Sequence, residues 1–453
     1  MSGEKQTEPG ALRAIGRPEA IGLLLACALA AAAALVVSGV VTGSFAPDTS
    51  GYFAAAASTN PWGEPRSPLY GYLAGALGAN ATDAGMVVLA QTLLHVVSVC
   101  IFYTGVRLAG IGRIGAFALA TAALLAQSNL YHLRLLLPEA PANALLLAGL
   151  GLTLAATRSA RMLAWLIVPI MLLVGAGYVL RPTQLPAIAI LPALYFVLAW
   201  RRRGDRRLLP PLAFMLALAL PFLAQSGVRL RAVDDFNIVS FGGYQMSGLA
   251  TFMLDPPLVA RLPDSVRPFA ETVLARRQQA EAAGTVPATP LNSDGARAFA
   301  SAALGYFDIF ARGYDNVLSG VIAPLRPADA SWVAWNRQLM AFSLATVLAD
   351  PVRYLAWVGG ATARLVGHAL ALNAPMLLAT ALWLATLLLA FVRRRDGTCE
   401  DAGAVSLIAL AWFACNGALP VLVTFPAARY IDSAAILLPA IPLVLAIGLV
   451  RRP

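Results

Sequence analysis

The chain has 453 residues, of which 59% are hydrophobic and 12% are charged, and its mean hydropathy is +0.72. About a quarter of the residues of a soluble domain are charged, so this composition excludes an ordinary soluble protein and predicts an all-α polytopic membrane protein. The net charge of +10 comes from 32 Arg and one Lys. Many of these arginines lie in short clusters between apolar runs, as signals of topology do, so nucleic-acid binding is a poor explanation of the charge.

A helix needs about 20 apolar residues to cross a bilayer, and the sequence contains ten such runs. The first is too long for the core of a signal peptide, so it is predicted to be a retained span. The four cysteines do not suggest a disulfide framework, since three of them lie in apolar runs. The ten runs lie near residues 20–42, 84–106, 114–131, 138–157, 162–180, 184–200, 208–226, 373–392, 404–424 and 433–450.

Basic residues divide unequally between the two sides of this topology. Seventeen fall in the connections of one side, and only Arg66, Arg134, Arg181 and Arg429 fall in the short connections of the other. The positive-inside rule then places both termini in the cytoplasm. The expected location is the cytoplasmic (inner) membrane. The seventeen are Lys5, Arg13, Arg17, Arg107, Arg113, Arg158, Arg161, Arg201, Arg202, Arg203, Arg206, Arg207, Arg393, Arg394, Arg395, Arg451 and Arg452.

The runs divide the chain into three parts. Residues 1–226 form an N-terminal transmembrane module with a first outer loop at 43–83, residues 227–372 a large outer loop, and residues 373–453 the C-terminal transmembrane helices. The outer loop is expected to contain helices near 264–283, 295–311 and 333–348. A further helix at 350–372 carries Arg353, Arg364 and His368, which are costly inside a bilayer, so it is predicted to lie in the outer interface as an amphipathic helix.

The first outer loop holds the leading candidates for a site. Asp48 and Tyr52 are four residues apart and would share one face of a helix, and Glu64 and Arg66 follow. An acid just outside a span, beside a proline-containing loop, is well placed to abstract a proton at the membrane surface. The alternative is that Asp48 is an N-cap and Tyr52 an anchor among lipid headgroups.

Other charges lie beside apolar runs on the same side of the membrane. Arg134 and Glu139 lie in one turn, Arg181 follows another span, and Arg429 and Tyr430 precede the last. The planar guanidinium of Arg suits a phosphate, which favours Arg181 and Arg429 as binding residues. The alternatives are snorkelling of each Arg to lipid headgroups and a salt bridge between Arg134 and Glu139.

Metal and nucleotide motifs are weak or missing. The oxygens of Asp48 and Glu139 could hold Mg²⁺ or Mn²⁺ together with phosphate oxygens, whereas the three histidines have no metal-ligand spacing. The sequence contains no nucleotide-phosphate loop, HExxH or CxxC motif. Any donor substrate is therefore expected to reach the site from the bilayer.

Several stretches together resemble a known class of enzymes. PDTSGYFAAA followed by RSPLYGYLAGAL resembles the first outer loop of the GT-C class of integral-membrane glycosyltransferases, especially the branch with protein O-mannosyltransferases and the lipid A aminoarabinose transferase. Further likenesses are LRLLLPEAPANALLLAGL, VLRPTQLPAIAILPALYFVL, ADPVRYL and ARYIDSAAILLPAIPLVL, in the order of the family.

The resemblance implies a GT-C-like fold and a transferase that moves a sugar from a polyprenyl-phosphate donor to an envelope glycan, lipid or protein acceptor on the outer face. Asp48 matches the family's reaction-centre acid and Glu139 the acid of its second outer turn. Arg181 and Arg429 match basic residues near the carrier phosphate. Glu64 and the large outer loop have no clear counterpart.

Three other functions remain open from the sequence. A polysaccharide polymerase or ligase also has many spans and a large outer loop. A lipid or solute transporter would be expected to have repeated, broken helices, and the sequence has no internal repeat. A non-catalytic membrane scaffold could retain the fold.

Overall fold

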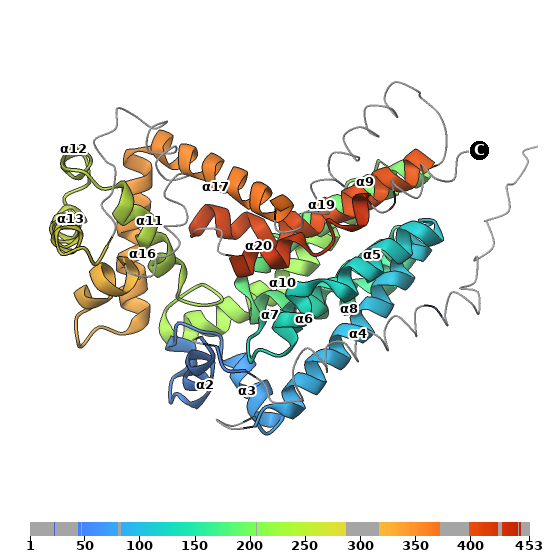
Figure 1. The fold of residues 1–453 in the computed structure, drawn as a ribbon, viewed down its shortest axis with the longest axis horizontal. Helices are drawn as coiled ribbons and strands as arrows, with labels where there is room; N and C mark the ends of the chain where they lie inside the picture. The colour runs from blue at the N-terminus through green and yellow to red at the C-terminus, as the bar shows by residue number, and fades with distance from the viewer. Residues whose placement is uncertain are drawn as a thin grey trace, which may run out of the picture.

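The computed structural model describes residues 22, 44–46, 48–79, 83–204, 206–286, 317–371, 398–424, 428–442 and 444. Within these residues the chain is helical, and the one pairing of extended backbone is an isolated bridge between Ser44 and Leu135. The predicted all-α architecture is therefore confirmed for the described part of the chain (Figure 1).

Six helices of the described residues are long and apolar enough to cross a bilayer, so the protein is a multi-pass membrane protein. Each coincides with a predicted span. They are α4 (Gly85–Leu108), α7 (Glu139–Ala156), α8 (Ala160–Leu180), α9 (Ala187–Arg203), α10 (Leu209–Val233) and α19 (Thr398–Val423).

Two of the ten predicted spans, at 20–42 and 373–392, lie outside the described residues. The run predicted as one span at 114–131 is divided into two helices, α5 (Arg113–Leu125) and α6 (Gln127–Leu133), which are separated at Ala126 by an extended ψ of 117°. The polar residues that open α6 favour a helix start over a helix interior. The described part of the last run is a shorter apolar helix, Tyr430–Pro442.

The two ends of the bundle differ in charge. Arg202, at the end of α9, donates hydrogen bonds to the Leu108 carbonyl oxygen (3.4 Å) and to Thr157 Oγ1 (3.5 Å). Three of the basic connections therefore meet at one end. At the other end of α4 lie the short helices of the first outer loop (Figure 1), which are α2 (Thr49–Ala57), η1 (Pro61–Gly63) and α3 (Pro68–Ala76).

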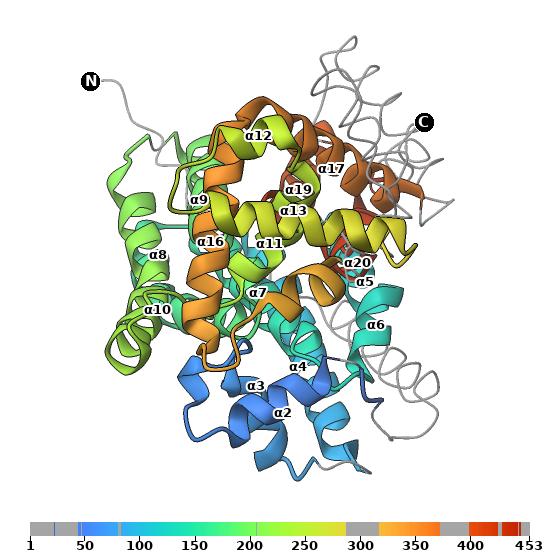
Figure 2. The same ribbon diagram turned by 90° about the vertical axis from the view of Figure 1, so that its left-hand side faces the viewer.

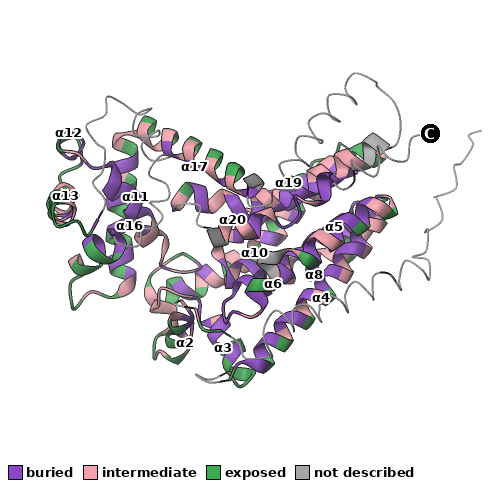
Figure 3. Cartoon of the chain, viewed as in Figure 1, coloured by how far each residue is buried: buried purple, intermediate pink, exposed green. Residues whose placement is uncertain are grey.

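The segment after α10 forms a second group of helices, on the side of the molecule away from the Arg202 end (Figures 1 and 2). Helix α11 is largely buried (Figure 3) because it packs on α16, and Arg277 donates to the Thr251 and Leu254 carbonyls at its C-terminal end. The group contains α11 (Gly242–Met253), α12 (Pro256–Ala260), α13 (Arg267–Ala282), η3 (Leu318–Ile322), η4 (Ala323–Leu325) and α16 (Trp332–Ala349). Helices α13 and α16 confirm two predicted helices, and the third, near 295–311, lies outside the described residues.

Helix α17 (Pro351–Ala371) matches the helix predicted at 350–372 and meets α16 at a bend of 100°. Arg353 pairs with Asp255 at 3.0 Å, and Tyr354 Oη donates to the Leu422 carbonyl oxygen at 2.8 Å, near the end of the α19 span. These contacts attach the start of α17 both to the second group of helices, through Asp255 before α12, and to the membrane-spanning helix α19. Its location in the membrane interface stays a prediction.

The closest helix contact in the bundle is between α4 and α7. A Cβ atom added to Gly105 would lie 1.8 Å from the Gly151 carbonyl oxygen, and one added to Gly151 would lie 2.5 Å from Phe102 Cα. Backbone therefore meets backbone, as small residues permit between membrane helices.

Replacing Gly105 with Ala should destabilise the protein by about 1–3 kcal/mol, the usual range for overpacking, because the new methyl group must push the two backbones apart. The measurement is thermal unfolding of the purified protein in detergent. The matched control is Gly227→Ala in α10, where an added Cβ meets nothing within 4 Å, and it should leave the melting temperature unchanged or raise it. Equal melting of both variants would contradict the tight contact.

Candidate functional site

A cavity of about 150 Å³ lies at the end of the bundle opposite Arg202 and the basic connections that meet there. Four segments that contain predicted site residues meet in this cavity. They are the first outer loop, the turn before α7, the segment after α8 and the start of the last apolar run. Five predicted site residues line it, which are Tyr52, Arg66, Glu139, Arg181 and Tyr430.

The first outer loop is held against the turn before α7 by its backbone. Ser44 N donates to the Arg134 carbonyl at 2.8 Å, and Leu136 N donates to the Ser44 carbonyl at 3.1 Å. Thr49 Oγ1 adds a buried hydrogen bond to the Leu136 carbonyl at 2.9 Å. These contacts fix α2, with Asp48 at its start, beside the N-terminus of α7.

Asp48 occupies the N-cap position of α2, but its side chain makes no cap hydrogen bond. Instead, Asp48 Oδ1 accepts from Arg66 Nη2 at 2.9 Å, and both side chains are about one-quarter exposed. The Arg66 guanidinium lies over the rings of Phe241 (4.5 Å) and Tyr52 (5.6 Å). Asp48 therefore reaches the cavity through Arg66, which lines it.

Tyr52 and Glu139 are buried, so Tyr52 is no headgroup anchor. The Tyr52 ring packs edge-on against Tyr70 at 5.6 Å, and Tyr70 Oη donates to Gln91 on α4. Burial first, then the charge of Glu139 and the Tyr52 hydroxyl, raise the pKa of Tyr70 far above its ordinary value, so Tyr70 stays a neutral donor. Glu139 begins α7 and is only 5% exposed.

Arg181 ends α8 and is also 5% exposed. Its Nη1 donates to Ser433 Oγ at 3.0 Å, and its guanidinium lies over the Tyr430 ring at 5.5 Å. Tyr430 and Ser433 belong to α20 (Ala428–Ala435), so the last apolar run orients this arginine.

Buried amides extend the polar contacts around Arg181. Gln184 Nε2, in η2 (Pro182–Gln184), donates to Asn143 Oδ1 at 3.0 Å and to Asn416 Oδ1 at 3.3 Å. Asn143 Nδ2 in turn donates to Ser433 Oγ at 3.4 Å. Side chains of α7, α19 and α20 are thereby joined next to Arg181, and such a network within a bundle stabilises one arrangement of its helices.

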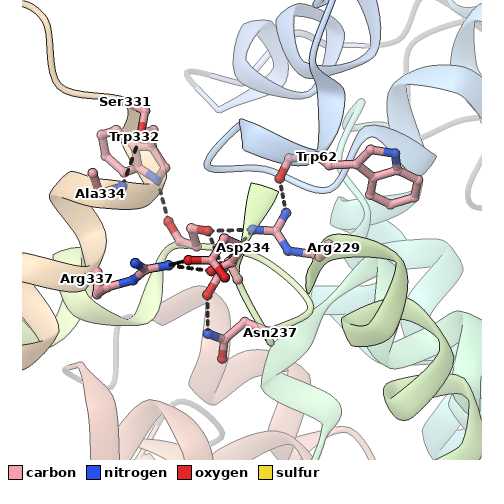
Figure 4. Close-up of polar contacts among 10 residues, drawn as sticks. Trp62, Arg229, Asp234, Asn237, Ser331, Trp332, Ala334 and Arg337 are labelled. Carbon is pink, nitrogen blue, oxygen red and sulfur yellow. Dashed lines mark hydrogen bonds and ion pairs between the residues drawn. The ribbon is translucent and has the colours of Figure 1, made fainter. Parts of the chain in front are cut away.

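The wall of the cavity nearest the second group of helices depends on Arg229, whose polar contacts are drawn in Figure 4. Its side chain is 1% exposed. Its Nη2 pairs with Asp235 Oδ2 at 2.8 Å and donates to Ser240 Oγ, while its Nη1 donates to the Trp62 carbonyl oxygen of the first outer loop. Trp332 Nε1 of α16 donates to the Ser240 carbonyl. The next residue, Phe241, stacks on Trp332 at 6.1 Å and lines the cavity.

Asp235 is held ionised by this cluster. Burial alone would raise its pKa, but hydrogen bonds from Ser240, Arg229 and Asn237, with the charge of Arg229, outweigh burial and hold the pKa below its usual value. The carboxylate can therefore keep its ion pair over a wide range of pH.

Besides Asp48, three predicted site residues are not among the residues that line the cavity. Glu64 accepts a hydrogen bond from Ser58 Oγ at 2.8 Å and lines a second hollow with Trp332. The Arg134 guanidinium lies over the Tyr131 ring at 4.5 Å. The Arg429 side chain lies outside the described residues.

The predicted metal site fits the geometry poorly. Arg66 lies 2.9 Å from Asp48, where its positive charge opposes a divalent cation. Among the described residues, no group of three or more His, Cys, Asp or Glu side chains is arranged to hold a metal ion.

Sequence reasoning missed Arg229, and also Phe241, Gln245 and Thr424 in the lining. Phe241 and Gln245 lie in the long outer segment, where no apolar run marks them, and Thr424 looks like an ordinary residue at the end of a span. Arg229 gave one usable signal, a charge in the final turns of the apolar helix α10.

The chain has no match among protein-family models, curated proteins or solved structures.

Proposed function

We propose that the protein is a membrane glycosyltransferase of GT-C type, which moves a sugar from a polyprenyl-phosphate donor to an acceptor on the outer face of the cytoplasmic membrane. The observation that carries the proposal is the cavity itself. It combines a buried carboxylate, Glu139, with two arginines, Arg66 and Arg181, at one end of a bundle of membrane spans. A lipid-linked anionic donor matches that location and charge.

In the proposed reaction, an acceptor hydroxyl attacks the anomeric carbon of the sugar and gives its proton to Asp48. The new bond joins the acceptor oxygen to the anomeric carbon, the bond from that carbon to the phosphate oxygen breaks, and the configuration inverts. Polyprenyl phosphate leaves with the electron pair. Arg181, whose guanidinium lies over the Tyr430 ring, stabilises the charge of this phosphate. The family resemblance assigns Arg429 to the same phosphate.

We further propose that both termini are cytoplasmic and that the cavity faces outward. The support is the meeting of the Arg107, Arg158 and Arg201–Arg203 connections at the end of the bundle opposite the cavity, as the positive-inside rule expects. The envelope glycan, lipid or protein acceptor would approach from the side of the outer helices.

The test is mass spectrometry of envelope glycans, lipids and proteins from cells lacking and overproducing the protein, followed by transfer assays with undecaprenyl-phosphate-linked monosaccharide. We expect a product larger by one sugar that disappears in the deletion strain. Turnover only of a pyrophosphate-linked oligosaccharide would instead show a polymerase or ligase, and no turnover of either donor would refute the enzyme.

A further inference from the structure

Two hydroxyl groups in the cavity wall are buried without a hydrogen-bond partner among the described residues. They are Ser67 Oγ, from a side chain only 3% exposed, and Thr183 Oγ1. A buried polar atom left unsatisfied costs about 1–3 kcal/mol. Such atoms in a cavity wall are donors available to a ligand.

Ser67 is notable because of its position. It is the N-cap of α3, where a serine side chain usually accepts a hydrogen bond from the first turn of the helix, but it makes no cap hydrogen bond. The hydroxyl is left available to the cavity. The N-terminus of the nine-residue helix α3, which carries partial positive charge, adjoins the same space.

The flanking residues complete a set of donors for an anion. Ser67 follows Arg66 directly, and Thr183 lies two residues after Arg181. Two guanidinium groups and two hydroxyls thus come from two separate segments of the chain that line one cavity. Among the lining residues the charged groups are the two arginines and Glu139, and Asp48, which does not line the cavity, pairs with Arg66.

We propose that Ser67 and Thr183 bind a phosphate group by donating hydrogen bonds to its oxygens between Arg66 and Arg181. A tetrahedral phosphate presents several acceptor oxygens in different directions, which suits rotatable hydroxyl donors as well as planar guanidinium groups. The identity of the phosphate as that of the polyprenyl carrier rests on the proposed function. The chemistry itself would also fit the phosphate of a lipid headgroup.

The test uses the full chain in phosphatidylethanolamine nanodiscs and measures binding of radiolabelled undecaprenyl phosphate. The variants are Ser67→Ala and Thr183→Val, which remove the hydroxyl and keep the shape. The matched control is Ser98→Ala in α4, which removes an equally buried hydroxyl that also lacks a partner among the described residues but does not line the cavity. Uncharged undecaprenol and phosphatidylglycerol serve as competitors.

We expect wild-type protein to bind undecaprenyl phosphate, with no competition from undecaprenol. Each cavity variant should weaken binding about 10- to 100-fold, as for a hydrogen bond to a charged group, while Ser98→Ala binds normally. Without ligand, neither cavity variant should melt below wild type. Wild-type affinity in both variants, or weak binding explained by earlier melting, would overturn the proposal.

Two outcomes separate this site from the proposed reaction. Equal competition by phosphatidylglycerol, without any sugar transfer, would keep the phosphate site and assign it to a headgroup, and the glycosyltransferase would be refuted. Sugar transfer by a protein whose Ser67→Ala and Thr183→Val variants bind like wild type would keep the enzyme and refute the hydroxyl site alone.

Discussion

The Asp48→Asn variant is expected to lose sugar transfer by about 10²- to 10⁴-fold, the usual contribution of a general base. Asn has the shape of Asp, and its amide oxygen can still accept the hydrogen bond from Arg66 that Asp48 accepts at 2.9 Å. Folding should therefore change little, whereas the group that takes the acceptor's proton is removed. Transfer from undecaprenyl-phosphate-linked sugar is measured in membranes that contain equal amounts of each variant.

The control for this experiment is Asp264→Asn. Asp264 is an acid of the segment after α10 that also pairs with an arginine, Arg267 at 2.8 Å, but its side chain is 92% exposed and it contacts no residue of the first outer loop through that pair. The Asp264→Asn protein should transfer sugar at the wild-type rate. Unchanged transfer by Asp48→Asn would remove Asp48 from the mechanism and direct attention to Glu139, the acid in the lining.

The second large effect is expected for stability, at Arg229. Replacing it with Met should destabilise the protein by about 3–5 kcal/mol, because removing one partner of a buried ion pair leaves the other charge uncompensated. Asp235 would lose its cation, and the Trp62 carbonyl would lose its donor. Thermal unfolding in detergent measures the loss, and limited proteolysis should show earlier cleavage of the first outer loop.

Arg337→Met is the matched control. Arg337 pairs with the adjacent acid, Asp234, at 3.3 Å (Figure 4). Both side chains of this pair are mostly exposed. Exposed pairs contribute little, so this variant should melt close to wild type. If the Arg229→Met protein melted at the same temperature as wild type, the contacts of Arg229 would not be what holds the first outer loop.

The same pair predicts a dependence of stability on pH. The folded pKa of Asp235 lies below its ordinary value, so its contribution to stability is complete above the unfolded pKa and is lost as the pH falls through the folded one. This acid-side loss should be smaller in the Arg229→Met protein, because Asp235 then has a higher folded pKa.

Most of the membrane-spanning helices could be predicted from the sequence, because a bilayer requires each span to be about 20 residues long and mainly apolar. That is why α7 and α8 agree closely with the predicted runs. The break at Ala126 was missed, since the apolar count near 114–131 is high enough for a span and only local backbone geometry interrupts it. Hydropathy measures composition and does not register such a break.

The site was partly predictable for a similar physical reason. Charges such as Glu139 and Arg181 are costly beside apolar runs, so their presence signals a role, and both line the cavity. Phe241 carries no such cost in an outer segment, and its place depends on stacking with Trp332, distant in sequence. Glu64 and Arg134 were expected at the same site on this reasoning but do not line the cavity, because a charge beside an apolar run can also make only local contacts.

The glycine contact between α4 and α7 has a mechanical consequence for the distant end of these helices. Gln91 lies on α4 and supports Tyr70, while Glu139 begins α7, and both are about 20 Å along their helices from the contact at 1.5 Å per residue. The two helices can therefore pivot about this contact. A small tilt introduced at this contact would displace the distant ends of α4 and α7 more than it displaces the residues at the contact. The separation of Tyr70 and Glu139 would therefore change most.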